Sequence, residues 1–233
     1  MSMTRRPVAS ALRNHYRLTW LAAGVIAAGI ALSSGTARAE SNFVNGAGTA
    51  TAHLNFQVII PKFLYLQVGT GTYPTTVATV DTISFDMTSA IASIGNGTAQ
   101  AATAASGDLG NGAVTARVVG NNFTAAVNLS AATTGPLSNG AGNTISWSEI
   151  TVATAAQAVV PASASTLAHP GTAAAPFADG ASTTVSLTPA ASSKVINQSA
   201  KWTFSYKNTN VPSSGTYGGA ANGGQVTYTI AMP

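Results

Sequence analysis

The stretch ATAHLNFQVII, residues 50–60, sets the first expectation for the fold. Apolar and polar residues alternate along it, which is the pattern of a β-strand with one buried face. Pro61 lacks a backbone donor and interrupts the pattern, which resumes at Leu64. We therefore expect one long first strand with a kink at the proline. Its apolar positions are Ala50, Ala52, Leu54, Phe56, Val58 and Ile60.

The same alternation recurs in short segments along the rest of the chain. Many short strands at regular spacing predict an all-β fold, a single antiparallel β-sandwich of immunoglobulin-like or jelly-roll type. Where the phase slips after Trp147, we expect a bulge near Glu149. Long Ala-, Gly- and Pro-rich loops are expected at residues 88–112 and 153–182. The expected strands are residues 77–87, 113–119, 123–129, 144–152, 183–188, 201–206 and 225–232.

The first 39 residues have the three zones of a cleaved secretory signal. Four arginines precede an uncharged apolar run at residues 18–32, and Ala37-Arg38-Ala39 offers small residues at the cleavage positions. The apolar run is short for a transmembrane helix, which needs about 20 residues. We expect cleavage before Glu40 and export through the periplasm to the medium or to a bacterial cell surface, without a membrane span.

Loss of this leader would change the charge of the protein. The whole chain has 10 Lys and Arg against 6 Asp and Glu, a net charge of +4. Five of the basic residues lie in the leader and all the acids follow it, so the mature chain would carry five basic and six acidic residues, a net charge of −1. Its basic residues are scattered, which argues against a nucleic-acid partner. Low net charge favours association between copies.

Residues able to carry chemistry are few. The chain has no cysteine, which excludes thiol catalysis and thiolate metal sites. His53 and His169 have no second histidine at metal-ligand spacing, so we expect both to be solvated. Asp81 and Asp86 stand five residues apart and would face opposite sides of a strand, which does not suit a carboxylate pair. We expect no enzyme activity, no catalytic residue, no metal site and no cofactor.

The two ends of the mature chain carry patterns that could fit each other. A polar lead enters the alternating residues 50–60, and the chain closes on GQVTYTIAMP, residues 224–233. A sandwich that lacks one strand has an open apolar groove, which an alternating segment from a neighbour can fill by strand addition. With the signal and the Thr-, Ala-, Asn- and Gly-rich body, the chain resembles bacterial fimbrial (pilin) subunits and related spore-coat-type secreted β-sandwich domains.

The resemblance implies three regions: a cleaved signal at 1–39, a donor strand at 40–60 and a β-sandwich domain at 61–233. It implies a homopolymeric surface fibre that serves adhesion or biofilm formation, assembled with a periplasmic chaperone and an outer-membrane assembly protein. The chain departs from many such subunits, because it has no cysteine pair after the first strand and Pro61 ends the alternation. The expected donor contacts are Ala52, Leu54, Phe56, Val58 and Ile60, and the expected groove-bordering residues are Val226, Tyr228 and Ile230.

A second interpretation is open. Residues 50–60 can be the first strand of a complete sandwich, paired within its own chain. The protein would then be a monomeric secreted or surface binding module, for example for glycans. Tyr73 and Tyr217, in loops beside Gly and Pro, are the aromatic residues that could stack on sugar rings. A fibre subunit should form stable high-mass species, whereas a module should run as a monomer.

Overall fold

The computed structural model describes residues 41–232. The expected signal peptide at 1–39 and the expected new N-terminus Glu40 lie outside the described residues. The chain divides into two units, Met1–Ile59 and Ile60–Pro233. Residues 41–59 of the first unit form no helix or strand, and each of them is exposed.

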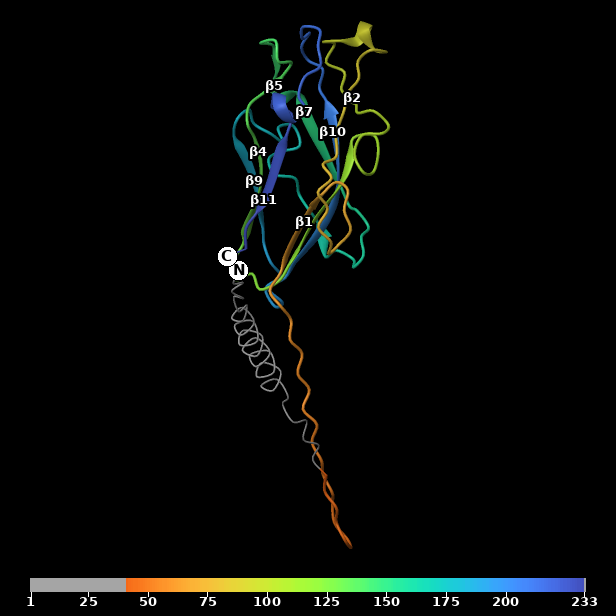
Figure 1. Cartoon of the computed structure of the whole chain (residues 1–233), viewed down its shortest axis with the longest axis vertical. Helices are drawn as coiled ribbons and strands as arrows, with labels where there is room; N and C mark the ends of the chain where they lie inside the picture. Colours follow the sequence, from red (N-terminus) through yellow and green to blue (C-terminus); the bar gives the residue numbers. More distant parts are fainter. Residues whose placement is uncertain (1–40, 233) are drawn as a thin grey trace, which may run out of the picture. The chain divides into compact units, whose positions relative to one another are not determined.

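The second unit is all-β and is built from two main sheets that face each other (Figure 1). The strands pair antiparallel, except for β8, which runs parallel to β10. The first sheet contains β1 (Leu64–Val68), β3 (Ala113–Gly120), β10 (Ile196–Tyr206) and β2 (Gln100–Ala101) in that order, with β7 (Ile150–Ala155) and β8 (Ser165–Thr166) also paired to β10. The second sheet contains β11 (Val226–Ile230), β4 (Val127–Thr133) and β9 (Ser182–Leu187). A small ribbon joins β5 (Leu137–Ser138) to β6 (Thr144–Ile145).

The core lies between the two main sheets. Alternate residues of β4 are buried, as expected for a strand with one face on the core. Leu129 of β4 and Trp202 of β10 are both fully buried, and burial of each such side chain contributes about 1.5–3 kcal/mol. The indole nitrogen of Trp202 donates to the carbonyl of Leu167 at 3.0 Å, so this large residue is buried without an unmatched donor. The predicted all-β sandwich is confirmed.

The prediction of one long first strand is wrong. Only Leu64–Val68 forms a strand, and residues 50–60 belong to none. An alternating sequence needs a backbone partner to become a strand, because the ladder bonds stabilise the extended chain. Alternation therefore indicates that one face of a segment can cover an apolar surface. It does not show whether that surface belongs to the same chain or to another one.

Residues 77–87 also form no strand, contrary to expectation. From Asp81 to Met87 the side chains still alternate in burial, and Ile83, Phe85 and Met87 pack against the core. The backbone is held by a neighbouring turn, since the carbonyls of Thr82 and Ser84 accept bonds from Gly107 and Thr103. The segment is extended and half-buried without a β-ladder.

Two further boundaries differ from expectation. β4 begins at Val127 and not at Phe123, although Phe123 is buried and its amide donates to the carbonyl of Lys194. The phase slip near Glu149 is a 3₁₀ helix, Trp147–Glu149, and not a bulge. The two expected long loops contain the short strands β2 and β8 and a 3₁₀ helix, Ile91–Ser93, and a third such helix is Ala220–Asn222. No helix among residues 41–232 is long and apolar enough to cross a membrane.

The strand register defines two ends of the sandwich. Leu64, Gly120 and Ile196 are aligned across the first sheet. We call this the basal end, because the chain enters the sandwich here at residues 60–63. At the opposite end, Tyr206 pairs with Ile150. We call that the distal end.

Candidate functional site

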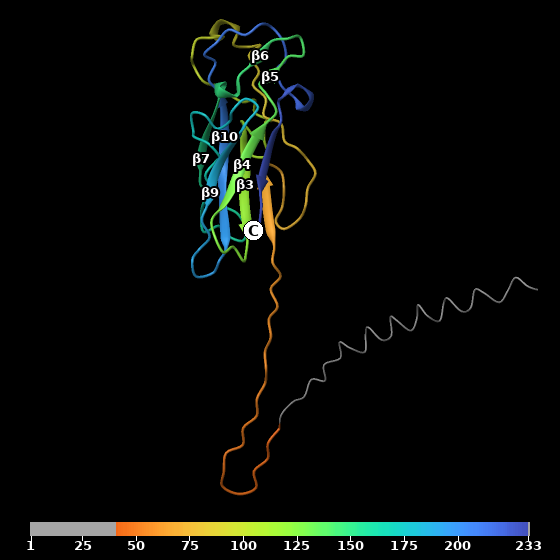
Figure 2. The same cartoon turned by 90° about the vertical axis from the view of Figure 1, so that its left-hand side faces the viewer.

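One lateral side of the sandwich is open between β1 and β11. Among the described strands β1 pairs only with β3, and β11 pairs only with β4. In Figure 2, β1 (orange) and β11 (dark blue) run along the same side, while Figure 1 shows them in opposite layers. Each strand therefore leaves one row of backbone N–H and C=O groups without a ladder partner at the same place. We call this the open side.

The open side is apolar and uncharged. β1 reads LYLQV and β11 reads VTYTI, so neither strand carries a charged residue. Natural edge strands are usually protected by charges, proline or bulges, and an edge without them is a template for another strand. The residues of the two strands that pack against the core are only half-buried. They are Leu64, Leu66, Val68, Val226, Tyr228 and Ile230.

The alternating segment, residues 50–60, is the second unusual surface. Phe56 is 87% exposed and Val58 is 83% exposed. Seven of the 13 large hydrophobic residues that are exposed in the described chain lie between residues 43 and 60. Scattered apolar residues on a surface are ordinary, but a contiguous exposed run marks an interaction site or an aggregation hazard.

The expected residues are thus placed in two groups. Leu54, Phe56, Val58 and Ile60 are exposed large hydrophobics, and Ala52 is exposed as well. Val226, Tyr228 and Ile230 lie on β11 at the open side, on its core-facing positions. The sequence analysis missed the contribution of β1 to this side. The alternation at Leu64, Leu66 and Val68 was the available signal, and it was assigned to a continuation of residues 50–60.

Tyr228 is anchored from inside the sandwich by His169. The imidazole Nε2 lies 2.9 Å from the Tyr228 hydroxyl, and Nδ1 is within hydrogen-bond distance of the Pro170 carbonyl. A carbonyl oxygen only accepts, so Nδ1 carries the proton and Nε2 accepts from the tyrosine O–H. Burial raises the pKa of Tyr228, so the hydroxyl keeps its proton.

The expectation of a solvated His169 is wrong. The side chain is 5% exposed and its ring meets aromatic rings from both sheets edge-on. Desolvation lowers its pKa from 6.5 to about 4, only partly opposed by the bond to the Pro170 carbonyl. The folded protein therefore binds this proton less readily than the unfolded chain. Through this group, stability is complete above pH 6.5 and is lost as the pH falls toward 4. His53, by contrast, is exposed.

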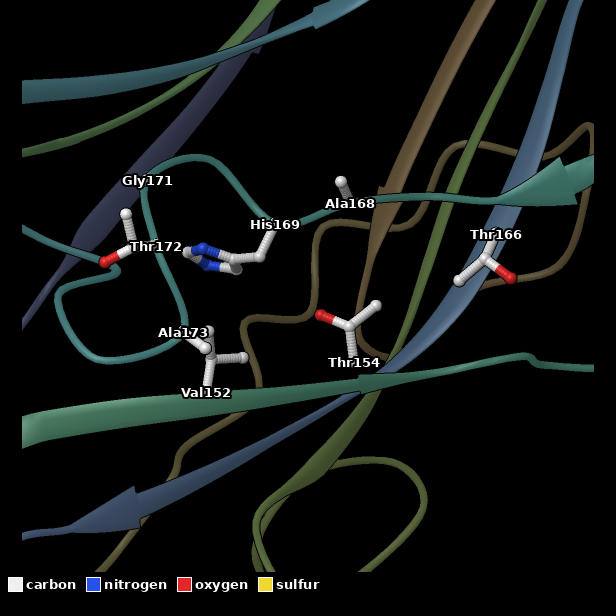
Figure 3. A pocket seen from close by; sticks show the side chains of 8 residues that line it. All are labelled: Val152, Thr154, Thr166, Ala168, His169, Gly171, Thr172 and Ala173. Carbon is white, nitrogen blue, oxygen red and sulfur yellow. The ribbon is translucent and has the colours of Figure 1, made fainter.

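A shallow pocket of about 340 Å³ lies beside His169, at the side of the first sheet formed by β7. Figure 3 shows the side chains that line it, with the imidazole between Thr172 on one side and Thr154 and Thr166 on the other. Both ring nitrogens are already engaged, by Pro170 and Tyr228, so the histidine offers this pocket neither a base nor a metal ligand.

The acidic residues stabilise separate turns. Asp81 accepts from Thr70, and Asp86 accepts from the amide of Thr88 at 2.9 Å and from its hydroxyl at 2.7 Å. These bonds lower the pKa of Asp86. Asp179 accepts from the amide of Trp147 at 2.8 Å. No group of three or more His, Cys, Asp or Glu gathers within residues 41–232 in a way that could hold a metal ion.

The loop aromatics considered for glycan stacking are held by other contacts. The Arg117 guanidinium lies 4.8 Å from the centre of the Tyr73 ring, and Tyr65 meets the same ring edge-on. Arg117 is buried and donates to the carbonyls of Val160 and Pro161 at 3.0 and 2.7 Å. Tyr217 donates to the Ser213 carbonyl at 2.7 Å. A single arginine within the apolar β3 was the only sequence signal for this arrangement.

No family model, no curated protein and no solved structure matches this chain.

Proposed function

We propose that the protein is the structural subunit of an extracellular surface fibre, in which the alternating segment of one copy fills the open side of another by β-strand addition. The observation that carries this proposal is the coexistence of two unpaired surfaces. The alternating segment exposes an apolar face, with Leu54 72% and Phe56 87% exposed. The open side presents two uncharged edge strands whose core-facing apolar side chains are only half-buried.

The two surfaces match in period and polarity. Side chains two residues apart on a strand are about 6.6–6.8 Å apart on the same face. Leu54, Phe56 and Val58 have this spacing, and so do Val226, Tyr228 and Ile230. Between the latter, Thr227 and Thr229 are exposed. The polar residues of the alternating segment would face solvent in the same way. The segment as a whole would extend the second sheet as a new strand next to β11.

The burial available to such a junction is large. If Leu54, Phe56 and Val58 become buried, their transfer from water contributes roughly 5–9 kcal/mol in total. Backbone bonds along β11 add to this, and the loss of conformational freedom of the segment opposes it.

In this proposal the chain is exported through the periplasm and acts at the cell surface in adhesion or biofilm formation, as a structural and not a catalytic protein. Its partners are copies of itself, with a periplasmic chaperone and an outer-membrane assembly protein during export. A monomeric binding module is the competing function. It would need residues 50–60 in its own sandwich, and they form no strand in the described chain.

The first test is electron microscopy and heat-graded electrophoresis of material sheared from cells that export the full chain. We expect filaments and high-mass ladders, and we expect both to disappear on deletion of residues 40–60. A monodisperse monomer from the full chain would refute the fibre.

A cross-linking test addresses the junction itself, because the chain has no cysteine of its own. Copies with Gln57→Cys or Asn55→Cys should form disulfide-linked dimers with copies carrying Thr229→Cys. Thr184→Cys is the matched control, since Thr229 and Thr184 flank the same residue of β4, Ser130, from opposite sides. Equal cross-linking to Thr184→Cys would refute strand addition next to β11.

A further inference from the structure

The charged side chains of residues 60–233 are distributed unevenly along the sandwich. Five are basic and five are acidic, so the unit as a whole is balanced. Lys62 and Lys194 lie at the basal end, where they line a hollow of about 390 Å³ with Ile60, Asn121, Asn122 and Ser193. The hollow is held together by two bonds, from Asn121 to the Pro61 carbonyl and from Phe123 to the Lys194 carbonyl. No acidic residue is among those that line it.

The distal end is acidic. Phe85 packs against Tyr206, the last residue of β10, which brings the neighbouring Asp86 to this end. Gly180 donates to Thr133, the last residue of β4, which brings Asp179 there as well. Both aspartates are exposed. Glu149 and Lys207 lie beside them at the end of β7 and β10, where the Lys207 amide donates to the Glu149 carbonyl.

The remaining four charges balance each other at mid-height. Asp108 accepts from the amide of Thr115, and Lys201 pairs with Thr115 across the sheet. Arg117 stands two residues further along β3, and Asp81 is bonded to Thr70, next to the end of β1. Summed over residues 60–233 alone, the side chains carry +2 at the basal end, 0 in the middle and −2 at the distal end.

From this distribution we propose a second contact surface between copies: the basal end, with Lys62 and Lys194, docks on the distal end of the next copy, with Asp86 and Asp179. This rests on the proposed fibre and adds the orientation of its subunits. Complementary ends speed encounter and select register, whereas like charges brought together disfavour the wrong arrangement.

A segment added antiparallel to β11 would produce the same pairing of ends. β11 runs from the distal end, where Val226 pairs with Thr133, to the basal end at Ile230. An alternating segment antiparallel to β11 would leave the open side at that copy's distal end. Lys62 follows Ile60 by two residues, or about 7 Å of extended chain, so it would face the acidic end. A parallel segment would instead bring Lys62 to the basal end of the other copy, against Lys62 and Lys194.

The test uses the fibre protein itself, dissociated in guanidinium and reassembled by dilution, with light scattering as the readout. At low ionic strength we expect Lys194→Glu to slow assembly about three- to tenfold, and we expect this difference to vanish near 0.5 M salt, where charges are screened beyond about 4 Å. Lys201→Glu changes the net charge equally at mid-height and should assemble like the wild type. Asp86→Lys should slow assembly as well, and the double variant Lys194→Glu/Asp86→Lys should recover the wild-type rate within about twofold.

Three outcomes would overturn the docking of basal on distal ends: Lys194→Glu assembling at the wild-type rate in low salt, Lys201→Glu slowing assembly as much, or no recovery in the double variant. Each of these leaves strand addition intact, because the wild type still polymerises. If the wild type itself does not polymerise and Gln57→Cys forms no cross-link with Thr229→Cys, the proposed fibre fails, and the docking fails with it.

Discussion

Phe56→Ser is the substitution that separates the role of the alternating segment from the stability of the sandwich. Phe56 is 87% exposed in the single chain, so its removal should leave the unfolding of the monomer unchanged. In a fibre the ring would be buried. A phenylalanine side chain covers at least about 150 Å², which at about 25 cal/mol per Å² is about 4 kcal/mol. Burial in a junction is incomplete and serine recovers part of this, so each junction should weaken by about 3 kcal/mol, or roughly 100-fold in its dissociation constant.

The assay is heat-graded electrophoresis of assembled material, together with thermal unfolding of the dissociated monomer by circular dichroism. Phe56→Ser should lower the temperature at which ladders dissociate, while the unfolding temperature of the monomer stays at the wild-type value. Gln57→Ser is the matched control, because residue 57 lies on the polar face of the same segment. Equal loss in the two variants would refute the assignment of faces. A lower unfolding temperature in monomeric Phe56→Ser would mean that the segment packs within its own chain.

Three further predictions concern the sandwich itself and are measured by urea unfolding of the monomer. Between pH 7 and pH 5 the free energy of unfolding should fall by about 2 kcal/mol through His169 alone, because its pKa of about 4 lies below the 6.5 of the unfolded chain. This part should be absent in His169→Phe, and an unchanged pH slope in that variant would contradict it. Tyr228→Phe removes the donor to His169 Nε2 and should cost about 1–3 kcal/mol at pH 7, whereas a neutral result would exclude that bond as an anchor of β11. Asn208→Ala should cost about 2–4 kcal/mol, since this fully buried amide accepts from Gly95 at 2.8 Å and donates to Ser93 at 2.7 Å. A loss below 1 kcal/mol would show that water replaces these bonds.

Several strands with a partner in their own chain were predictable from the sequence, although β4 was expected too early, at 123–129. The expected segments 113–119 and 183–188 agree with β3 and β9 to within a residue, because both are rich in β-branched residues and follow a glycine-containing turn. The expected segment 50–60 alternates as a whole and the expected segment 77–87 alternates in its second half, yet neither forms a strand. The period of the apolar residues shows which face of a segment is apolar. A strand also needs the free edge of another strand to pair with, and whether such an edge is available depends on the topology of the whole fold.

The candidate site was predictable only in part for the same reason. Val226, Tyr228 and Ile230 could be placed on a last strand, but the sequence does not show that β1 would stand opposite β11 in the other sheet. His169 could not be placed either. It lies in a Pro- and Gly-containing loop that reads as solvated, and its burial depends on rings supplied by Trp202 and Tyr228, which are distant in sequence.

The exposed apolar residues of the alternating segment raise a physical problem that the proposed fibre resolves. An unpaired segment with high β-propensity and no charge, such as NFQVII at residues 55–60, is an aggregation hazard in the unassembled protein. The open side of the same protein is a second unprotected edge, and the chain has neither disulfides nor many surface charges to keep copies apart. These features are liabilities in a monomer, and each becomes useful when one copy's segment covers the next copy's open side. Such an assembly needs the two surfaces kept apart until export is complete, which is the task that a chaperone bound to the open side would perform.

A fragment of residues 43–60, added in excess to the dissociated protein, should therefore cap the open side and suppress polymerisation. The same fragment with Phe56→Ser should do so about 100-fold less effectively. Suppression by the variant at the same concentration would show that the fragment acts through general stickiness and not through the alternating face.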